Sequence, residues 1–336
     1  MHELKIAVFI IILIINPVNL FFEGNLNFEA SALSVFKHQA QHVAIYKDFI
    51  QSLNVDPAKI NSIKEIPFLP VSFFKSHKVN DNANPERIVF TSSGTTGEIS
   101  RHFVNDIDLY IKSFTTGFKL FYGDIKDYCF LALLPSYLER EGSSLVFMCD
   151  SLIKQSGHPL SGFYLNDISL LIKHLKLLQQ QKQRVILMGV TYALIDLAKN
   201  TLDFPELIVI ETGGMKGRGR ELVREEVHDI LTKGFNVEKI HSEYGMTELL
   251  SQAWSKGDGI FECPPWMKIL IRDVNDPFHI LGENQTGGIN IIDLANYHSS
   301  SFIATQDLGM KFKNDCFEVL GRFDHSDLRG CNLLVG

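Results

Sequence analysis

Apolar residues follow two kinds of pattern along the chain, and both predict regular structure. From Leu33 to Leu53 they recur at three- and four-residue steps, which is typical of an amphipathic helix. Further on, short apolar runs that resemble buried strands alternate with stretches of helical spacing. We predict strands at 128–134, 184–188, 207–211 and 237–241, and helices at about 143–154, 167–179, 192–199 and 220–233.

Strand–helix alternation of this kind predicts an α/β fold, with a doubly wound, mostly parallel sheet. Beyond about residue 266 the pattern changes to strands and turns, at 267–272, 288–293 and 316–320, which indicates a smaller β-rich C-terminal subdomain. Residues 66–71 contain two prolines and are expected to be extended across the surface rather than a central strand. Because ligands of such sheets bind beyond the carboxyl ends of strands, the loops after the strands are examined for chemistry.

Composition narrows the class of protein. With 336 residues, 45% of them hydrophobic and 21% charged, the chain is globular rather than disordered. A net charge of -7 without a basic run excludes nucleic acid as the main partner. The five cysteines form no C-x-x-C pair and are odd in number, which favours a reduced, cytoplasmic chain over a disulfide scaffold or a zinc cluster.

The N-terminus carries an apolar run at 6–15, behind Lys5, that resembles the central region of a signal peptide. It is too short to span a bilayer. We favour the interpretation that residues 1–30 are an apolar extension and that residues 31–336 form one domain. The extension would either result from a mis-called start codon or pack on the domain as a strand. Association with a membrane stays open.

A glycine- and hydroxyl-rich loop follows the strand-like residues 88–90. Its sequence suits a nest of backbone N–H groups and hydroxyls for phosphate oxygens, although no Lys follows it as in a Walker loop. An ordinary polar turn is the alternative. The loop consists of Thr91, Ser92, Ser93, Gly94, Thr95, Thr96 and Gly97.

A second motif, His241 to Glu248, follows the strand predicted at 237–241. Glu248 beside a phosphate would be repulsive, so a role there requires a cation between them, and Mg²⁺ prefers oxygen ligands. The alternative is a helix start with Thr247 and Glu248 as capping residues.

Two further segments carry an acidic residue beside glycine, at 305–309 and 321–324, the second continuing to Arg329 and Gly330. An acidic residue in a turn accepts hydrogen bonds from ribose hydroxyls, and an arginine pairs with ribose or phosphate. Taken singly, each segment is equally an ordinary turn.

The order and spacing of these four motifs resemble the acyl-adenylate-forming superfamily. Within it, residues 66–75 (IPFLPVSFFK) and 212–217 (TGGMKG) are similar to the acyl-protein synthetase (LuxE-type) family. The similarity runs from about Leu33 to the C-terminus.

The resemblance implies a role for each motif. The loop from Thr91 to Gly97 would hold the β- and γ-phosphates of ATP. Gly213 and Gly214 would form the wall over the adenine. Tyr244 would stack on the adenine, with Gly245 directly after it, and Thr247 would contact the α-phosphate. Glu248 would hold Mg²⁺, and Lys216 would be a general anion partner. Asp307 would bind the ribose hydroxyls with help from Arg322.

Two departures from the superfamily pattern stand out. Many members carry a Lys shortly after the loop, where this chain has Glu98-Ile99-Ser100-Arg101. Larger relatives continue past Arg329-Gly330 into a mobile C-terminal domain, whereas this sequence stops at Gly336, which predicts that this domain is lacking.

The expected function is ATP-dependent activation of a fatty acid, or another carboxylic acid, to an acyl-adenylate. Transfer to a protein cysteine would follow, and the resemblance points to Cys331, although burial as a small apolar residue is the alternative there. A reductase or another acyl-accepting protein is the implied partner. An acyl- or aryl-CoA ligase resembling phenylacetate-CoA ligase, and a non-catalytic nucleotide-binding module, are the other hypotheses.

Overall fold

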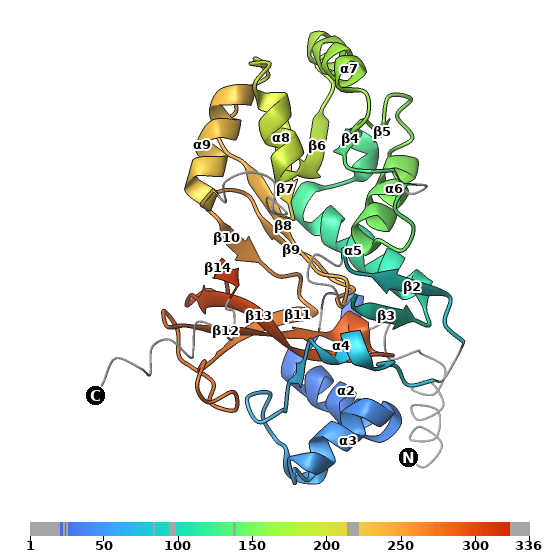
Figure 1. Cartoon of the computed structure of the whole chain (residues 1–336), viewed down its shortest axis with the longest axis vertical. Coiled ribbons are helices and arrows are strands. Elements are labelled where there is room, and N and C mark those ends of the chain that lie inside the picture. The colour runs from blue at the N-terminus through green and yellow to red at the C-terminus, as the bar shows by residue number, and fades with distance from the viewer. Residues whose placement is uncertain are drawn as a thin grey trace, which may run out of the picture.

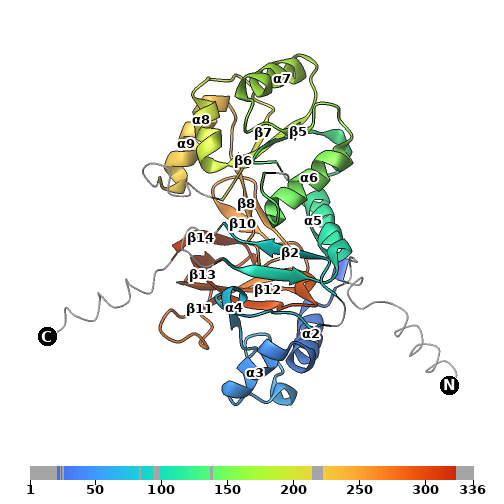
Figure 2. The same ribbon diagram turned by 45° about the vertical axis from the view of Figure 1, so that its right-hand side comes forward.

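One large mixed β-sheet runs through the molecule. The computed structural model describes residues 21–22, 24, 26–82, 85–93, 99–136, 139–213 and 222–322. In this part of the chain eleven strands join in the order β11-β12-β13-β14-β10-β9-β8-β7-β6-β4-β5, and β1, which pairs with β13, is the twelfth strand of the sheet. Figures 1 and 2 show the strands passing from the antiparallel end, near α2, to the parallel end, near α7.

The parallel half of the sheet confirms the predicted α/β alternation. Its strands β4 and β6 are buried along their whole length, as their apolar runs require. In both views α8 and α9 lie on one side of these strands and α5 and α6 on the other. The strands are β4 (Cys129–Leu133), β5 (Gly162–Phe163), β6 (Val185–Val190), β7 (Ile208–Thr212) and β8 (His241–Tyr244). The helices are α5 (Ile107–Tyr122), α6 (Ser144–Ser156), α7 (Ile168–Gln180), α8 (Thr191–Ala198) and α9 (Arg224–Phe235).

The β-rich C-terminal part continues the same sheet rather than forming a second one. Antiparallel pairs link β8 to β9, β9 to β10 and β10 to β14, so the sheet is mixed instead of mostly parallel. The strands are β9 (Ala253–Ser255), β10 (Ile260–Glu262), β11 (Met267–Arg272), β12 (Thr286–Asp293), β13 (Phe302–Lys311) and β14 (Phe317–Arg322).

The single helix predicted from Leu33 to Leu53 is two helices, α2 (Phe28–His42) and α3 (Ala44–Ser52). Val43 between them is extended and fully buried, so its apolar character gave no sign of the break. Gln39 of α2 is also buried, and its amide donates to the carbonyl groups of Asn296 and Tyr297. These bonds fix α2 to the antiparallel half of the sheet.

The prediction that residues 66–71 lie across the surface is wrong. The segment is extended, but Ile66 and Phe68 are buried, and β1 (Leu69–Pro70) pairs in parallel with β13. Tyr46 donates a hydrogen bond of 2.6 Å to the Pro67 carbonyl group. The prolines are accommodated because β1 is a short strand outside the main strand order.

A two-stranded sheet stands beside the large one. It pairs β2 (Ile88–Thr91) with β3 (Arg101–Val104) in antiparallel register, and the short helix α4 (Phe73–Ser76) packs near it. The apolar run predicted at 6–15 lies outside the described residues. Within the described part of the chain, no helix combines the length and the apolar character that crossing a bilayer requires.

Asp293 at the end of β12 ties the turn after β8 to the short helical turn Leu294–Asn296. Its carboxylate is fully buried and accepts from the backbone N–H groups of Leu250, Ser251 and Ala295 and from the Ser251 hydroxyl, at 2.6–3.1 Å. In asparagine one of the two carboxylate oxygens becomes an NH₂ group, which cannot accept hydrogen bonds from these donors.

We expect Asp293→Asn to lower the free energy of unfolding by about 2 kcal/mol or more, because a buried donor that loses its acceptor costs that much. Urea denaturation measures the change. Asp229→Asn, which alters only an exposed pair with Lys233 on α9, is the control and should cost far less. Equal effects of the two substitutions would contradict the role assigned to Asp293.

Candidate active site

Three of the predicted site residues meet where β8, β13 and β14 approach one another. The Tyr244 hydroxyl donates to Asp307 Oδ2 at 2.7 Å, and Arg322 Nε donates to Asp307 Oδ1 at 3.2 Å. Asp307 and Arg322 are direct partners in the β13–β14 register. Both residues therefore lie inside strands, and the prediction that they sit in turns is wrong.

The aromatic ring of Tyr244 is held by two phenylalanines. Its centroid lies 5.9 Å from that of Phe261 and 5.6 Å from that of Phe317, both in edge-to-face geometry. Burial, with Asp307 beside the hydroxyl, raises the pKa of Tyr244 well above its usual value. The phenol therefore stays neutral and acts as a donor to Asp307.

Glu248 lies in the turn after β8 and is 6% exposed. Burial raises the pKa of its carboxyl group, while a hydrogen bond from Ser100 and the charge of Arg322 lower it and the charge of Asp307 raises it. None of the ion pairs in the described residues involves Glu248. A buried carboxylate in this setting is stabilised by a cation brought next to it.

The donor set around Glu248 fits Mg²⁺ bound together with a nucleotide. Among the described residues, no three His, Cys, Asp or Glu side chains are grouped so that they would hold a metal ion. Mg²⁺ commonly uses one or two carboxylates and completes its coordination with substrate phosphates and water. Glu248 supplies one such carboxylate, so the remaining ligands would come from the substrate.

The two ends of the glycine- and hydroxyl-rich loop are joined and reach Glu248. Ser92 N–H donates to the Ser100 carbonyl at 3.1 Å, and Ser100 N–H donates to Ser92 Oγ at 3.0 Å. Thr91 N–H donates to Gly142 O, and Ser93, the last described residue of the first half of the loop, is exposed. We call the bonded pair Ser92 and Ser100 the base of the loop. Because a hydrogen bond from Ser100 lowers the pKa of Glu248, this base adjoins the motif after β8. Gly94, Thr95, Thr96 and Gly97 lie outside the described residues.

The ends of β7 and β8 meet through an acidic residue that sequence reasoning gave no role. Thr212 Oγ1 donates to Glu243 Oε2 at 2.5 Å, just before Gly213, whose φ of 77° favours glycine. A side chain at Gly245 would collide with the Glu243 carboxylate, so that glycine keeps room for it. Gly214 and Lys216 lie outside the described residues, as does Cys331.

Sequence reasoning also missed three residues that support the motifs: Ser100, His102 and Asn296. His102 on β3 donates to the Thr247 carbonyl at 2.9 Å, and Asn296 donates to the Glu248 carbonyl at 2.7 Å. Ser100 and His102 are close to the loop in sequence but match no motif. Asn296 follows β12 with no local signal, so its contact appears only in the folded chain.

The N-terminal part of the chain matches a known protein family. Residues 6–136 match the model of the family described as acyl-protein synthetase, LuxE. The predicted resemblance to the LuxE family is thereby confirmed over these residues. The match contains the apolar run at 6–15 and the loop from Thr91 to Gly97, and it ends before β5. A search of curated proteins found no match.

The fold is similar to that of solved acyl-CoA ligases. ATP-bound MatB from Rhodopseudomonas palustris superposes with a TM-score of 0.55 at 16% identity, over 73% of this chain and 49% of that chain. An open 2-hydroxyisobutyryl-CoA ligase in complex with 2-HIB-AMP and CoA gives 0.67 at 13% identity, over 88% of this chain and 69% of that chain. This chain therefore spans about half the length of MatB, and the likeness shows that it shares the fold of these proteins.

Glu243 provides a pH test of the site's geometry. Burial, together with the nearby charge of Glu211, raises the pKa of the Glu243 carboxyl group to about 7, although the hydrogen bond from Thr212 lowers it. The folded state thus holds this proton more tightly than the unfolded state does, so the contribution to stability is present at low pH and lost as the pH rises through about 7.

We expect Glu243→Gln to flatten the fall in stability between about pH 5 and 8, by up to about 3 kcal/mol at the upper end, since one pKa unit corresponds to about 1.4 kcal/mol. Urea denaturation across this range measures it. Glu238→Gln is the control, because that side chain is exposed. Parallel pH profiles for wild type and Glu243→Gln would contradict the raised pKa.

Proposed function

We propose that this chain activates a carboxylic acid, most simply a fatty acid, with ATP and then transfers the acyl group to a cysteine thiol. One observation carries the proposal: the contacts that run from the loop base through Ser100 to Glu248, beside the Tyr244–Asp307–Arg322 cluster. Residues that lie far apart in the sequence thus face one place. The likeness to ligases solved with ATP or with an acyl-AMP supports the same assignment.

In the first step a carboxylate oxygen of the acid attacks the α-phosphorus of ATP. The bond from that phosphorus to the bridging oxygen breaks, and pyrophosphate leaves with the electron pair, so no proton is transferred. Two anions must approach, and catalysis therefore depends on positioning and on neutralising charge. Mg²⁺ held by Glu248 and the phosphates would supply positive charge there.

The chain's own residues would position the nucleotide. The ring of Tyr244 would lie against the adenine, next to Gly213 at the end of β7. Asp307 would accept hydrogen bonds from the ribose hydroxyls, since a carboxylate oxygen takes more than the one bond that each now receives. The backbone of the loop that begins at Thr91 would bind the β- and γ-phosphates, and Thr247 the α-phosphate.

In the second step a thiolate attacks the acyl carbon, the bond from that carbon to the AMP oxygen breaks, and the thiol proton passes to solvent. Burial raises the pKa of all four described thiols, that of Cys129 to about 11, and those of Cys149, Cys263 and Cys316 in the same direction. Such thiols are poor nucleophiles at neutral pH. The resemblance to acyl-protein synthetases points instead to Cys331 as the acceptor.

The first step is tested by acid-dependent exchange of pyrophosphate into ATP across a panel of carboxylic acids. We expect Glu248→Ala to lower the exchange rate at least about 100-fold, because removing one preorganised charged contact commonly costs that much. Glu238→Gln, an exposed change outside the site, should retain the wild-type rate. Exchange at the wild-type rate by Glu248→Ala would contradict the role of Glu248.

The second step is tested by mass spectrometry of the intact protein after incubation with ATP and the preferred acid. Cys331→Ser should retain pyrophosphate exchange but acquire no hydroxylamine-labile acyl mass. Cys263→Ser, which alters a half-buried thiol, should behave as the wild type does. An acyl mass on Cys331→Ser would refute the acceptor assignment, and acyl transfer to added coenzyme A alone would support the CoA ligase alternative.

A further inference from the structure

Two buried side chains hold successive backbone carbonyl groups of the motif after β8. His102 Nδ1 lies 2.9 Å from the carbonyl oxygen of Thr247, and Asn296 Nδ2 lies 2.7 Å from that of Glu248. His102 is 1% exposed and Asn296 is fully buried. They come from β3 and from the short helical turn after β12, so two distant segments fix the same two residues.

The partner of His102 determines its protonation. A carbonyl oxygen only accepts, so Nδ1 must carry the hydrogen. Burial lowers the pKa of His102 to about 4, and the ring is therefore neutral at pH 7. Its Nε2 is then an acceptor, and this atom is buried with no hydrogen-bond partner among the described residues.

The side chain of Asn296, like that of His102, has one polar atom that is bonded to a carbonyl group and one that is not. Its Nδ2 donates to the Glu248 carbonyl, and its Oδ1 is a buried acceptor for which the described part of the chain supplies no partner. Both side chains line one small pocket between the start of α5 and the turn after β12, together with Asn105, His298 and Ser299. The two positioning contacts thus meet at one place in the fold, between β3 and the turn after β12.

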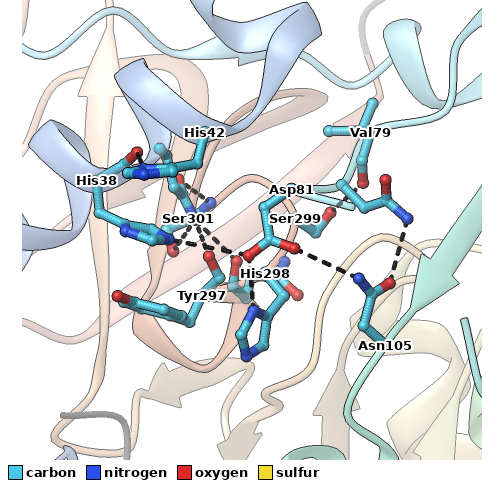
Figure 3. A network of polar contacts seen from close by, with 12 residues as sticks. His38, His42, Val79, Asp81, Asn105, Tyr297, His298, Ser299 and Ser301 are labelled. Carbon is cyan, nitrogen blue, oxygen red and sulfur yellow. Dashed lines mark hydrogen bonds and ion pairs between the residues drawn. The ribbon is translucent and has the colours of Figure 1, made fainter. Parts of the chain in front are cut away.

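The opposite wall of this pocket is fixed by a polar network around Asp81 (Figure 3). Asp81 Oδ2 accepts from His298 Nδ1 at 2.7 Å, and its Oδ1 accepts from Asn105 at 3.4 Å. Ser299 Oγ donates to the Val79 carbonyl at 2.9 Å. The pocket is therefore bounded by side chains that are themselves held in place.

We propose that His102 and Asn296 are positioning residues, which hold the backbone of Thr247 and Glu248 so that both side chains face the nucleotide. The inference rests on the proposed function. A shift of these backbone groups would misplace Thr247 and Glu248 together, and displacements of about 1 Å cost up to about 100-fold in rate.

The test uses four variants of the full chain. Asn places an N–H where His Nδ1 stands, whereas Gln places its amide nearer to Nε2, and Phe has no polar group. We expect His102→Phe and His102→Gln to lower kcat of pyrophosphate exchange about tenfold or more, with KM for the acid unchanged, and His102→Asn to restore most of the rate. The control is His174→Phe, which removes a histidine on the remote helix α7 that is hydrogen-bonded to Tyr164.

Two readouts separate this inference from the proposed function. Pyrophosphate exchange and MgATP binding, by calorimetry, are measured on every folded variant. Absence of exchange in the wild type with every acid would refute the proposed function, and MgATP binding would then test His102. Equal kcat values for His102→Asn and His102→Gln would overturn the positioning role. If no exchange occurs, equal MgATP binding by these two variants would overturn it as well. Neither outcome depends on whether His102→Phe folds.

Asn296 offers an independent check. In Asn296→Asp an oxygen replaces Nδ2 and faces the Glu248 carbonyl, so the bond is replaced by repulsion between two acceptors. We expect a loss of kcat similar to that of His102→Phe, again without a change in KM for the acid. A wild-type kcat in this variant would overturn the proposal for Asn296.

Discussion

The carboxylate of Asp307 is the point at which the two halves of the sheet are joined by side chains. Tyr244 reaches it from β8, the last parallel strand, and Arg322 reaches it from β14, which belongs to the antiparallel half. Because β9 and β10 separate β8 from β14 in the sheet, the aromatic contacts of Tyr244 with Phe261 and Phe317 are what bring these groups together. The site exists only when the two halves fold as one sheet.

Negative charge is concentrated at the same edge. Glu248 and Asp307 influence each other, Glu243 lies beside Glu211, and burial raises the pKa of both Glu248 and Glu243. Such an arrangement disfavours charge in the protein alone. A magnesium ion bound at Glu248 would offset this for that carboxylate, whereas the described hydrogen-bond partner of Glu243 is the Thr212 hydroxyl.

The sequence predicted the parallel half well and the antiparallel half less well, for a physical reason. The runs at 128–134, 184–188 and 207–211 appear as β4, β6 and β7, of which β4 and β6 are buried on both faces and β7 is partly buried. Strand β13 was missed because Thr305, Asp307 and Gly309 resemble a turn, although pairing with both β12 and β14 holds them extended. Tyr244, Asp307 and Arg322 were found from motif order. His102 and Asn296 were not, because their contacts join residues 145 and 48 positions apart.

The backbone and the side chains of the motif after β8 have different partners, and this separation explains how a turn with no regular structure can position chemistry. The carbonyl groups of Thr247 and Glu248 are bound by buried side chains from β3 and from the turn after β12. The Glu248 carboxylate instead interacts with the Ser100 hydroxyl beside the loop and with its own backbone N–H group. The backbone of the motif is thus held by groups in the core, whereas the side chain proposed to bind the metal lies against the segment beside the loop.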